Sequence, residues 1–153
     1  MTYDLDRFKI AQAHTNVGFE QARLELIAGE KTGHWIWYIF PQMKGLGKSL
    51  TSEKFGIISL EEAQAYLKDE NLGPRLIELV NILLVPSQNH SALEIFGYTD
   101  AIKFRSSMTL FHQAVDKDQQ LKEDERLTCF QQALEKFYGG KLDFRTMEIL
   151  NSV

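Results

Sequence analysis

The sequence is poor in the residues that usually build covalent or metal-based sites. It has one cysteine, Cys129, in 153 residues, which excludes an internal disulfide and any metal cluster built on cysteine. The four histidines (His14, His34, His90 and His112) are scattered, and none belongs to an HExxH pattern. We therefore expect no metal site and no cofactor.

Long apolar runs are also missing. No run approaches the about 18 apolar residues that a membrane-spanning helix needs, and the N-terminal MTYDLDRFKIAQ lacks the apolar core of a signal peptide. The net charge of −4 argues against general nucleic-acid binding, because such a surface must neutralise phosphates. We expect a cytoplasmic protein that binds neither membranes nor nucleic acids in general.

Apolar residues at steps of three and four dominate the chain, and period-two alternation is missing. This pattern predicts a mainly α-helical fold with little or no sheet, in a single helical domain spanning 1–153. The expected helices cover 5–11, 16–28, 34–40, 59–67, 71–85, 91–96, 101–115, 127–137 and 144–150, with loops at 86–90 and 116–124. The expected signals for helix ends are Gly29, Gly97 and Gly139. The expected signals for helix starts are the capping boxes Ser59–Glu62 and Ser91–Glu94, a cap at Thr99 or Asp100, and a cap at Asp143. In the last helix, Phe144, Met147 and Leu150 are expected to point inward.

The stretch 33–56, GHWIWYIFPQMKGLGKSLTSEKFG, puts apolar bulk beside flexible and basic residues. It contains both tryptophans, Trp35 and Trp37. Because burying one tryptophan removes roughly 150–250 Å² from water, we expect at least one of them in the core, and the other is a candidate wall of a pocket. His34 is either a packed, hydrogen-bonded side chain or a proton carrier.

The run after Pro41, QMKGLGKS, suits an anion-binding loop, since its glycines free backbone amides and Lys48-Ser49 follows. It is not a P-loop, because GxxxxGK[ST] requires a glycine where Gln42 stands and no strand pattern precedes it. A P-loop NTPase is excluded, and a looser anion-binding loop remains.

The KFRSSMTLF segment predicts a helix with two polar faces. Lys103, Ser106 and Ser107 share one face, and Arg105 and Thr109 belong to another. Two hydroxyl donors beside a lysine can bind an anion. Alternatively, the serines bond back to the preceding turn and the lysine lies in water. The sequence leaves both interpretations open.

Taken together, the segments HWIWYIFPQ, GLGKS, FGI, YLKDENLGPRL, IFG, KFRSSMTLF and FYGGKLDFRT resemble the family catalogued as domain of unknown function 1810. The resemblance runs from about residue 5 to residue 150 and implies a mainly α-helical, cytoplasmic protein, without implying a reaction. Two positions depart from the family pattern, which has tyrosine at Phe55 and commonly arginine at Lys48. The family's motif positions include His34, Trp35, Trp37, Pro41, Gln42, Gly45, Gly47, Ser49, Lys103, Arg105, Ser106, Ser107 and Thr109.

Two functional hypotheses follow. The first is a pocket for an anionic, phosphorylated or nucleotide-like small molecule, with a metal-independent hydrolytic or transfer reaction if chemistry occurs. Its catalytic candidate is His34, and its ligand-binding candidates are Trp35, Trp37, Gln42, Lys48, Ser49, Lys103, Arg105, Ser106, Ser107 and Thr109. The second is a non-enzymatic interaction protein or homo-oligomer that uses the tryptophan-rich stretch as an interface anchor.

Overall fold

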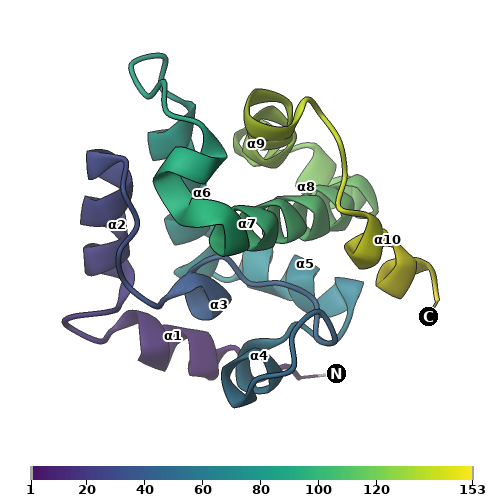
Figure 1. Cartoon of the computed structure of the whole chain (residues 1–153). Coiled ribbons are helices and arrows are strands. Elements are labelled where there is room, and N and C mark those ends of the chain that lie inside the picture. Colours follow the sequence, from purple (N-terminus) through teal and green to yellow (C-terminus); the bar gives the residue numbers. More distant parts are fainter. Residues whose placement is uncertain (1, 153) are drawn as a thin grey trace.

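The computed structural model describes residues 2–152, and within that range the chain forms helices and loops without a strand (Figure 1). The mainly α-helical fold with little or no sheet is therefore confirmed. The elements are α1 (Asp6–Gln12), α2 (Phe19–Ala28), α3 (Ile36–Ile39), α4 (Leu50–Phe55), α5 (Leu60–Lys68), α6 (Leu72–Leu84), α7 (Ala92–Asp116), α8 (Gln119–Lys122), the 3-10 helix η1 (Glu125–Thr128), α9 (Cys129–Tyr138) and α10 (Phe144–Asn151). None of these helices combines the length and the apolarity needed to cross a membrane.

Helix α7 crosses the middle of the molecule, and α3, α5, α8, α9 and α10 all pack against it (Figure 1). It is broken at Gly97, whose φ of 77° and ψ of 169° lie outside the helical region. The predicted break at Gly97 is thus confirmed. The expected cap at Thr99 or Asp100 is wrong, because Gly97 is the one residue with non-helical backbone angles and the second part of α7 already begins at Tyr98.

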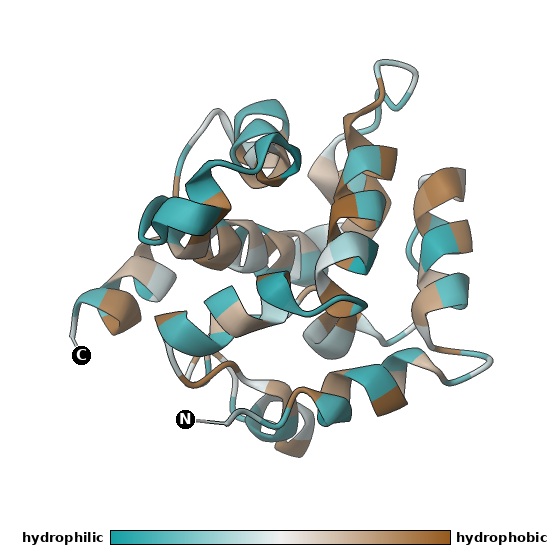
Figure 2. Cartoon of the chain, turned by 180° about the vertical axis from the view of Figure 1, so that it is seen from behind, coloured by the Kyte–Doolittle hydropathy of each residue, from teal (hydrophilic) through white to brown (hydrophobic). Residues whose placement is uncertain are grey.

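The core is built from apolar residues of every part of the chain, and its largest buried side chains are aromatic. Phe104 of α7 lies at the centre, with its ring centroid 4.9 Å from that of Phe40 and 4.7 Å from that of Phe96. Bands of hydrophobic and hydrophilic residues alternate along the helix ribbons (Figure 2), as expected where each helix turns one side to a shared core.

Local end signals decide most helix boundaries. Gly29 and Gly139 end α2 and α9 in the left-handed conformation, with φ of 78° and 63°. The Ser91 side chain and Glu94 form a complete capping box at the start of α7, and Asp143 caps α10. These predictions are confirmed because each depends on a few neighbouring residues.

The predicted capping box of α5 is only half formed. The Ser59 hydroxyl accepts a hydrogen bond from the Glu62 N–H at 3.1 Å, as expected. The Glu62 carboxylate, however, accepts from the Ile58 N–H at 2.8 Å and pairs with the Arg7 guanidinium at 2.9 Å. Arg7 also donates to the Gly56 carbonyl at 3.0 Å. The Glu62 carboxylate therefore holds Arg7 of α1 against the segment between α4 and α5 and does not close the box.

The C-terminal third departs from prediction at two places. The expected loop at 116–124 contains the short helix α8, capped by the Asp118 side chain, which accepts from the Leu121 N–H at 3.0 Å. Phe144 was expected to point inward, but it is 73% exposed. The helix turns Thr146, which is fully buried, toward the core in its place. Cys129 is buried, and burial raises the pKa of its thiol to about 12.

The Glu25 carboxylate organises the turn that leads from α2 into α3. One oxygen accepts hydrogen bonds from the Thr32 and Gly33 N–H groups at 2.8 and 2.9 Å and from the Trp35 indole at 3.0 Å. The other oxygen accepts from the Gln21 side chain at 2.8 Å. Burial alone raises the pKa of Glu25, but these four donors outweigh it and lower the pKa to about 2.

We expect Glu25→Gln to lower the free energy of unfolding by about 1–3 kcal/mol at pH 7, because it weakens hydrogen bonds made to a charged acceptor. The lowered pKa stabilises the fold above the ordinary value of 4.5, and this contribution disappears as pH falls toward about 2. Urea unfolding of wild type and variant from pH 7 to pH 3 should show the difference shrinking below about pH 5. The control, Glu20→Gln on the exposed side of α2, should change stability by less than about 0.5 kcal/mol, and a pH-independent difference at Glu25 would contradict the assignment.

Candidate functional site

A cavity of about 360 Å³ lies between the loop that follows α3, the first turns of the second part of α7, and the start of α10. It brings together two stretches that are about 60 residues apart in the sequence. Six of the residues predicted as ligand-binding line it, namely Trp37, Gln42, Lys48, Ser49, Lys103 and Ser106. The other lining residues are Leu46, Gly47, Thr99, Ile102, Asp143 and Arg145.

Backbone pairing closes the base of the loop. The Ile57 N–H donates to the Gln42 carbonyl, and the Lys44 N–H donates to the Ile57 carbonyl, both at 2.8 Å. These bonds form an isolated parallel bridge between Met43 and Ile57. Gln42 therefore has a fixed backbone although it lies in a loop, and its side chain is placed at the cavity by that pairing.

Glycine is required where the loop turns back over Trp37. A Cβ atom on Gly47 would lie 2.8 Å from the Trp37 ring and 2.8 Å from the Ser52 side chain, closer than real Cβ atoms come to their neighbours. Ser49 then caps α4, its hydroxyl accepting from the Ser52 N–H at 3.1 Å. The loop predicted to bind an anion is thus a tightly packed turn, in which Gly47 allows the backbone to pack against the Trp37 ring.

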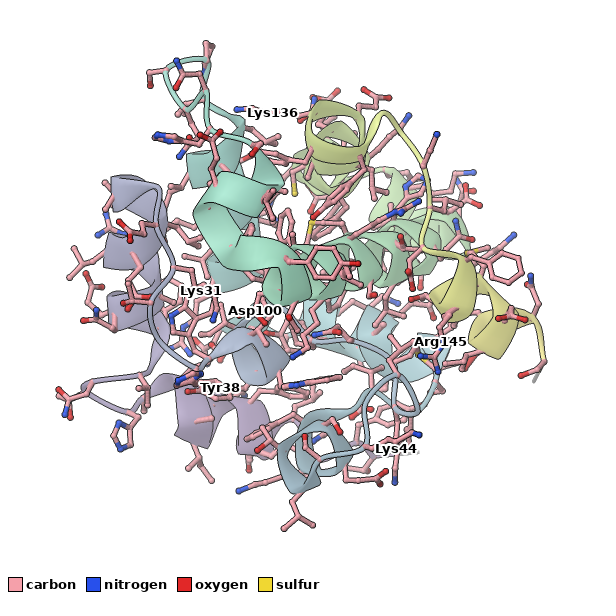
Figure 3. All side chains as sticks on the ribbon, in the orientation of Figure 1. Lys31, Tyr38, Lys44, Asp100, Lys136 and Arg145 are labelled. Carbon is pink, nitrogen blue, oxygen red and sulfur yellow. The ribbon has the colours of Figure 1, made fainter. Side chains whose placement is uncertain are left out.

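The Lys103 ammonium has two neighbours that hold it at the cavity. Its nitrogen lies 5.5 Å from the centroid of the Trp37 ring and 3.6 Å from a carboxylate oxygen of Asp100. Asp100 also pairs with Lys31 at 2.5 Å, and Figure 3 shows these two side chains close together. Because Lys31 takes up much of the Asp100 charge, the positive charge of Lys103 is only partly compensated.

Trp37 is only 8% exposed. With Lys103 over its ring and the Gly47 backbone against its edge, little of the aromatic face remains open to a ligand. The Trp37 ring thus holds the Lys103 ammonium through a cation–π contact. It also packs against the turn at Gly47. A ligand that stacks on Trp37 would have to displace Lys103.

Gln42 carries an unsatisfied hydrogen-bond donor. Its side chain is 1% exposed, it lines the cavity, and its amide nitrogen Nε2 has no hydrogen-bond partner. Leaving such a buried donor unpaired costs about 1–3 kcal/mol, and most buried polar groups in proteins are paired. This amide is therefore the clearest polar feature of the cavity that the protein itself does not use.

Positive charge prevails at the cavity. Lys48, Lys103 and Arg145 line it together with one carboxylate, Asp143. One oxygen of that carboxylate, Oδ2, accepts hydrogen bonds from the backbone N–H and the hydroxyl of Thr146 at 3.0 and 2.5 Å. The Arg145 guanidinium lies 3.5 Å from the carbonyl of Gly45, in the loop that follows α3. Figure 3 shows Arg145 on the same side of the molecule as Lys44 of that loop.

Three of the predicted residues have structural partners and do not line this cavity. Trp35 is fully buried and donates to Glu25. Thr109 is fully buried and its hydroxyl accepts from the Asp143 N–H at 2.9 Å, while Arg105 donates to the carbonyls of Lys141 and Leu142 at 3.0 and 2.8 Å. Thr109 and Arg105 thus position the segment that brings Asp143 and Arg145 to the cavity.

The remaining predicted residues behave differently from one another. His34 is exposed and does not line the cavity. Ser106 lines the cavity and also makes the expected bond back to the preceding turn, its hydroxyl donating to the Ile102 carbonyl at 3.2 Å. Ser107 is fully buried and does not line the cavity, and its hydroxyl has no hydrogen-bond partner.

Thr99, Asp143 and Arg145 line the cavity although no pattern in the sequence predicts them as site residues. Asp143 was read only as a helix cap, and Arg145 follows it by two residues. The signal that could have found both is the FYGGKLDFRT segment, which was used for the family resemblance and not for the site. Among the residues that the structure describes, no group of three or more His, Cys, Asp or Glu side chains could hold a metal ion.

We expect Gly47→Ala to lower the free energy of unfolding by about 1–3 kcal/mol, because the added methyl group overlaps the Trp37 ring and the Ser52 side chain. Thermal and urea unfolding measure the loss, and Trp fluorescence reports the shift of the ring. Leu50→Ala is the control, since Leu50 lies in the same region and is 90% exposed. Equal stability of the two variants would show that the loop does not press on Trp37.

Comparison with known proteins agrees with the family resemblance. The family model described as "Protein of unknown function (DUF1810)" matches residues 2–150. The crystal structure of the conserved hypothetical protein Rv1873 from Mycobacterium tuberculosis, at 1.38 Å, has a TM-score of 0.85 and 45% sequence identity, and the match covers 97% of each chain. No curated protein matches the chain. The chain belongs to the DUF1810 family.

Proposed function

We propose that the cavity between the 42–49 loop, α7 and α10 binds a small organic anion, of the phosphorylated or nucleotide-like class. Its volume of about 360 Å³ falls within the range of about 300–1,000 Å³ typical of small-molecule sites. Lys48, Lys103 and Arg145 supply positive charge, and the hydroxyl groups of Ser49 and Thr99 add donors that a phosphate can accept from.

The observation that carries the proposal is the unpaired amide of Gln42. A buried donor without a partner in the protein favours a ligand whose acceptor oxygen can come within hydrogen-bond distance of it. The lining also contains three cations (Lys48, Lys103 and Arg145) and three hydroxyl groups (Ser49, Thr99 and Ser106). An anionic ligand with oxygen acceptors matches both features.

Lys103 supports the same conclusion because it is already oriented. Trp37 and Asp100 restrict its side chain, so a ligand that pairs with the ammonium loses less conformational entropy than it would on a mobile surface lysine. Its side chain is 29% exposed, so the ammonium remains accessible. A partly preorganised cation and an unpaired amide donor thus belong to the lining of one cavity.

The proposal concerns binding and does not include a reaction. His34, the predicted proton carrier, is exposed and does not line the cavity, and its catalytic role stays a prediction. The alternative of an interface anchored by the tryptophan-rich stretch finds little support in the burial of the rings. Trp35 and Trp37 are 0% and 8% exposed, so they offer little surface to a partner.

Ligand binding is tested by thermal shift and calorimetry against inorganic phosphate, sugar phosphates, nucleotides and ADP-ribose, with adenosine as the uncharged comparison. A ligand at 100 times its Kd should stabilise the protein by roughly 2.7 kcal/mol. Lys103→Ala should weaken binding about tenfold or more, because it removes the held cation. Lys122→Ala, an exposed lysine on α8, should bind like wild type, and a flat response of the wild type to every phosphate would contradict the proposal.

Gln42→Met separates binding from stability. The substitution keeps the side-chain length and removes the unpaired amide, so the free energy of unfolding without ligand should stay the same or rise by up to about 1–2 kcal/mol. Affinity for the phosphate ligand found above should fall about fivefold or more. Urea unfolding and calorimetry on one preparation measure both quantities, and a stability loss above about 1 kcal/mol would show that the amide is satisfied within the protein.

A further inference from the structure

A second cavity adjoins the proposed site on the other side of the first turns of α7. Its volume is about 370 Å³, and it shares Ile102 and Asp143 with the first cavity. The two concavities are therefore neighbours along one surface, with Ile102 and Asp143 between them. A ligand bound in the first cavity has this second one directly beside it.

The second cavity is lined mainly by apolar and aromatic side chains, with Arg105 as its one cation, whereas three cations line the first. Its floor includes Phe137 and Tyr138 of α9, and its rim includes Leu93 and Tyr98, which are 59% and 75% exposed. Ile102 on the shared edge is 48% exposed. Single exposed apolar residues are common on protein surfaces, whereas a group of large ones around a hollow indicates a binding site.

The break at Gly97 creates this arrangement. Leu93 precedes the break and Tyr98 follows it, at φ 77° for Gly97, and both side chains line the hollow. No side chain fills the position of Gly97, where a Cβ atom would meet nothing within 4 Å. The Tyr98 ring is thus presented at an open corner of the helix.

The cation that lines the second cavity is already committed. Arg105 donates through Nε to the Lys141 carbonyl at 3.0 Å and through Nη2 to the Leu142 carbonyl at 2.8 Å, and it lies 5.8 Å from the Tyr138 ring. These bonds hold the segment before α10 in place. The second cavity accordingly suits a ring or an apolar group better than a second anion.

We infer that the two cavities form one bipartite site for an aromatic ring joined to a phosphate, as in aryl phosphates and nucleoside monophosphates. This inference rests on the proposed function, because the phosphate occupies the cavity of Lys103 and Gln42. The ring crosses the edge formed by Ile102 and stacks against Tyr98, with Phe137 and Tyr138 beneath it. The ring platform is therefore Tyr98, and Trp37 serves to hold the lysine.

Calorimetry with five probes tests the inference: inorganic phosphate, ribose 5-phosphate, phenyl phosphate, AMP and adenosine. AMP should bind at least about tenfold more tightly than ribose 5-phosphate, since stacking of one base on one aromatic ring accounts for a change of that size. Phenyl phosphate should likewise bind more tightly than inorganic phosphate. In Tyr98→Ala the AMP advantage should disappear, while the Kd of ribose 5-phosphate stays unchanged.

Tyr98→Ala and Phe144→Ala both replace exposed side chains, so a change in ligand affinity cannot be caused by loss of folding. Tyr98 is 75% exposed, so its loss should leave the melting temperature nearly unchanged. Phe144→Ala is the matched control, because Phe144 is an aromatic residue with 73% exposure near the site that lines neither cavity. It should leave every Kd as in wild type.

The outcomes separate this inference from the proposed function. If ribose 5-phosphate binds and is weakened by Lys103→Ala, but AMP binds no more tightly or Tyr98→Ala affects both equally, the bipartite site is overturned and the anion site stands. If no phosphate binds, both fall. A loss of the AMP advantage in Tyr98→Ala and not in Phe144→Ala supports the second cavity as the ring site.

Discussion

The burial of residues 106–111 of α7 on all sides is the constraint on which the rest of the structure depends. From Ser106 to Phe111 every side chain of this helix is buried. A polar residue in such a position must find a partner within the protein or remain unpaired. Thr109 finds one in the Asp143 backbone, Ser106 finds one in the preceding turn, and Ser107 finds none. The helix that appears polar in sequence thus forms the centre of the molecule.

The same constraint explains how the candidate site is assembled. Polar residues in and just before this buried segment of α7 hold chain segments on both sides of the helix in place. Arg105 and Thr109 secure the segment before α10, and Asp100 joins α7 to Lys31 ahead of α3. The cavity is the gap left between these secured segments, where Lys103 and Ser106 face the 42–49 loop. The position of the cavity therefore follows from how these segments pack.

Features that depend on neighbouring residues could be predicted from the sequence, and features that depend on distant ones could not. Gly29, Ser91 and Asp143 end or cap helices through bonds within a few residues, and they were identified from spacing alone. Glu62 was misread because Arg7, 55 residues away, competes for its carboxylate. Arg105 was assigned to a ligand, whereas its partners are carbonyls 36 and 37 residues further along the chain.

For the site, residue types on two stretches indicated the right region but not the individual roles. Lys48, Ser49 and Lys103 were selected for charge and hydroxyl groups, and they do line one cavity. Nothing in the sequence distinguishes Trp35 from Trp37, since both belong to one apolar run, and only the path of the chain places Trp35 against Glu25 and Trp37 at the cavity. Arg145 was missed because an exposed arginine after a helix cap has no local pattern that singles it out.

The burial of the single thiol gives the molecule an internal reporter of its own motions. Cys129 opens α9, is 2% exposed, and has its pKa raised to about 12. A thiol reagent can therefore react with it only during transient openings that separate α9 from its neighbours. Since the sequence holds no other cysteine, the labelling rate measures how often that helix detaches, and does so without any change to the chain.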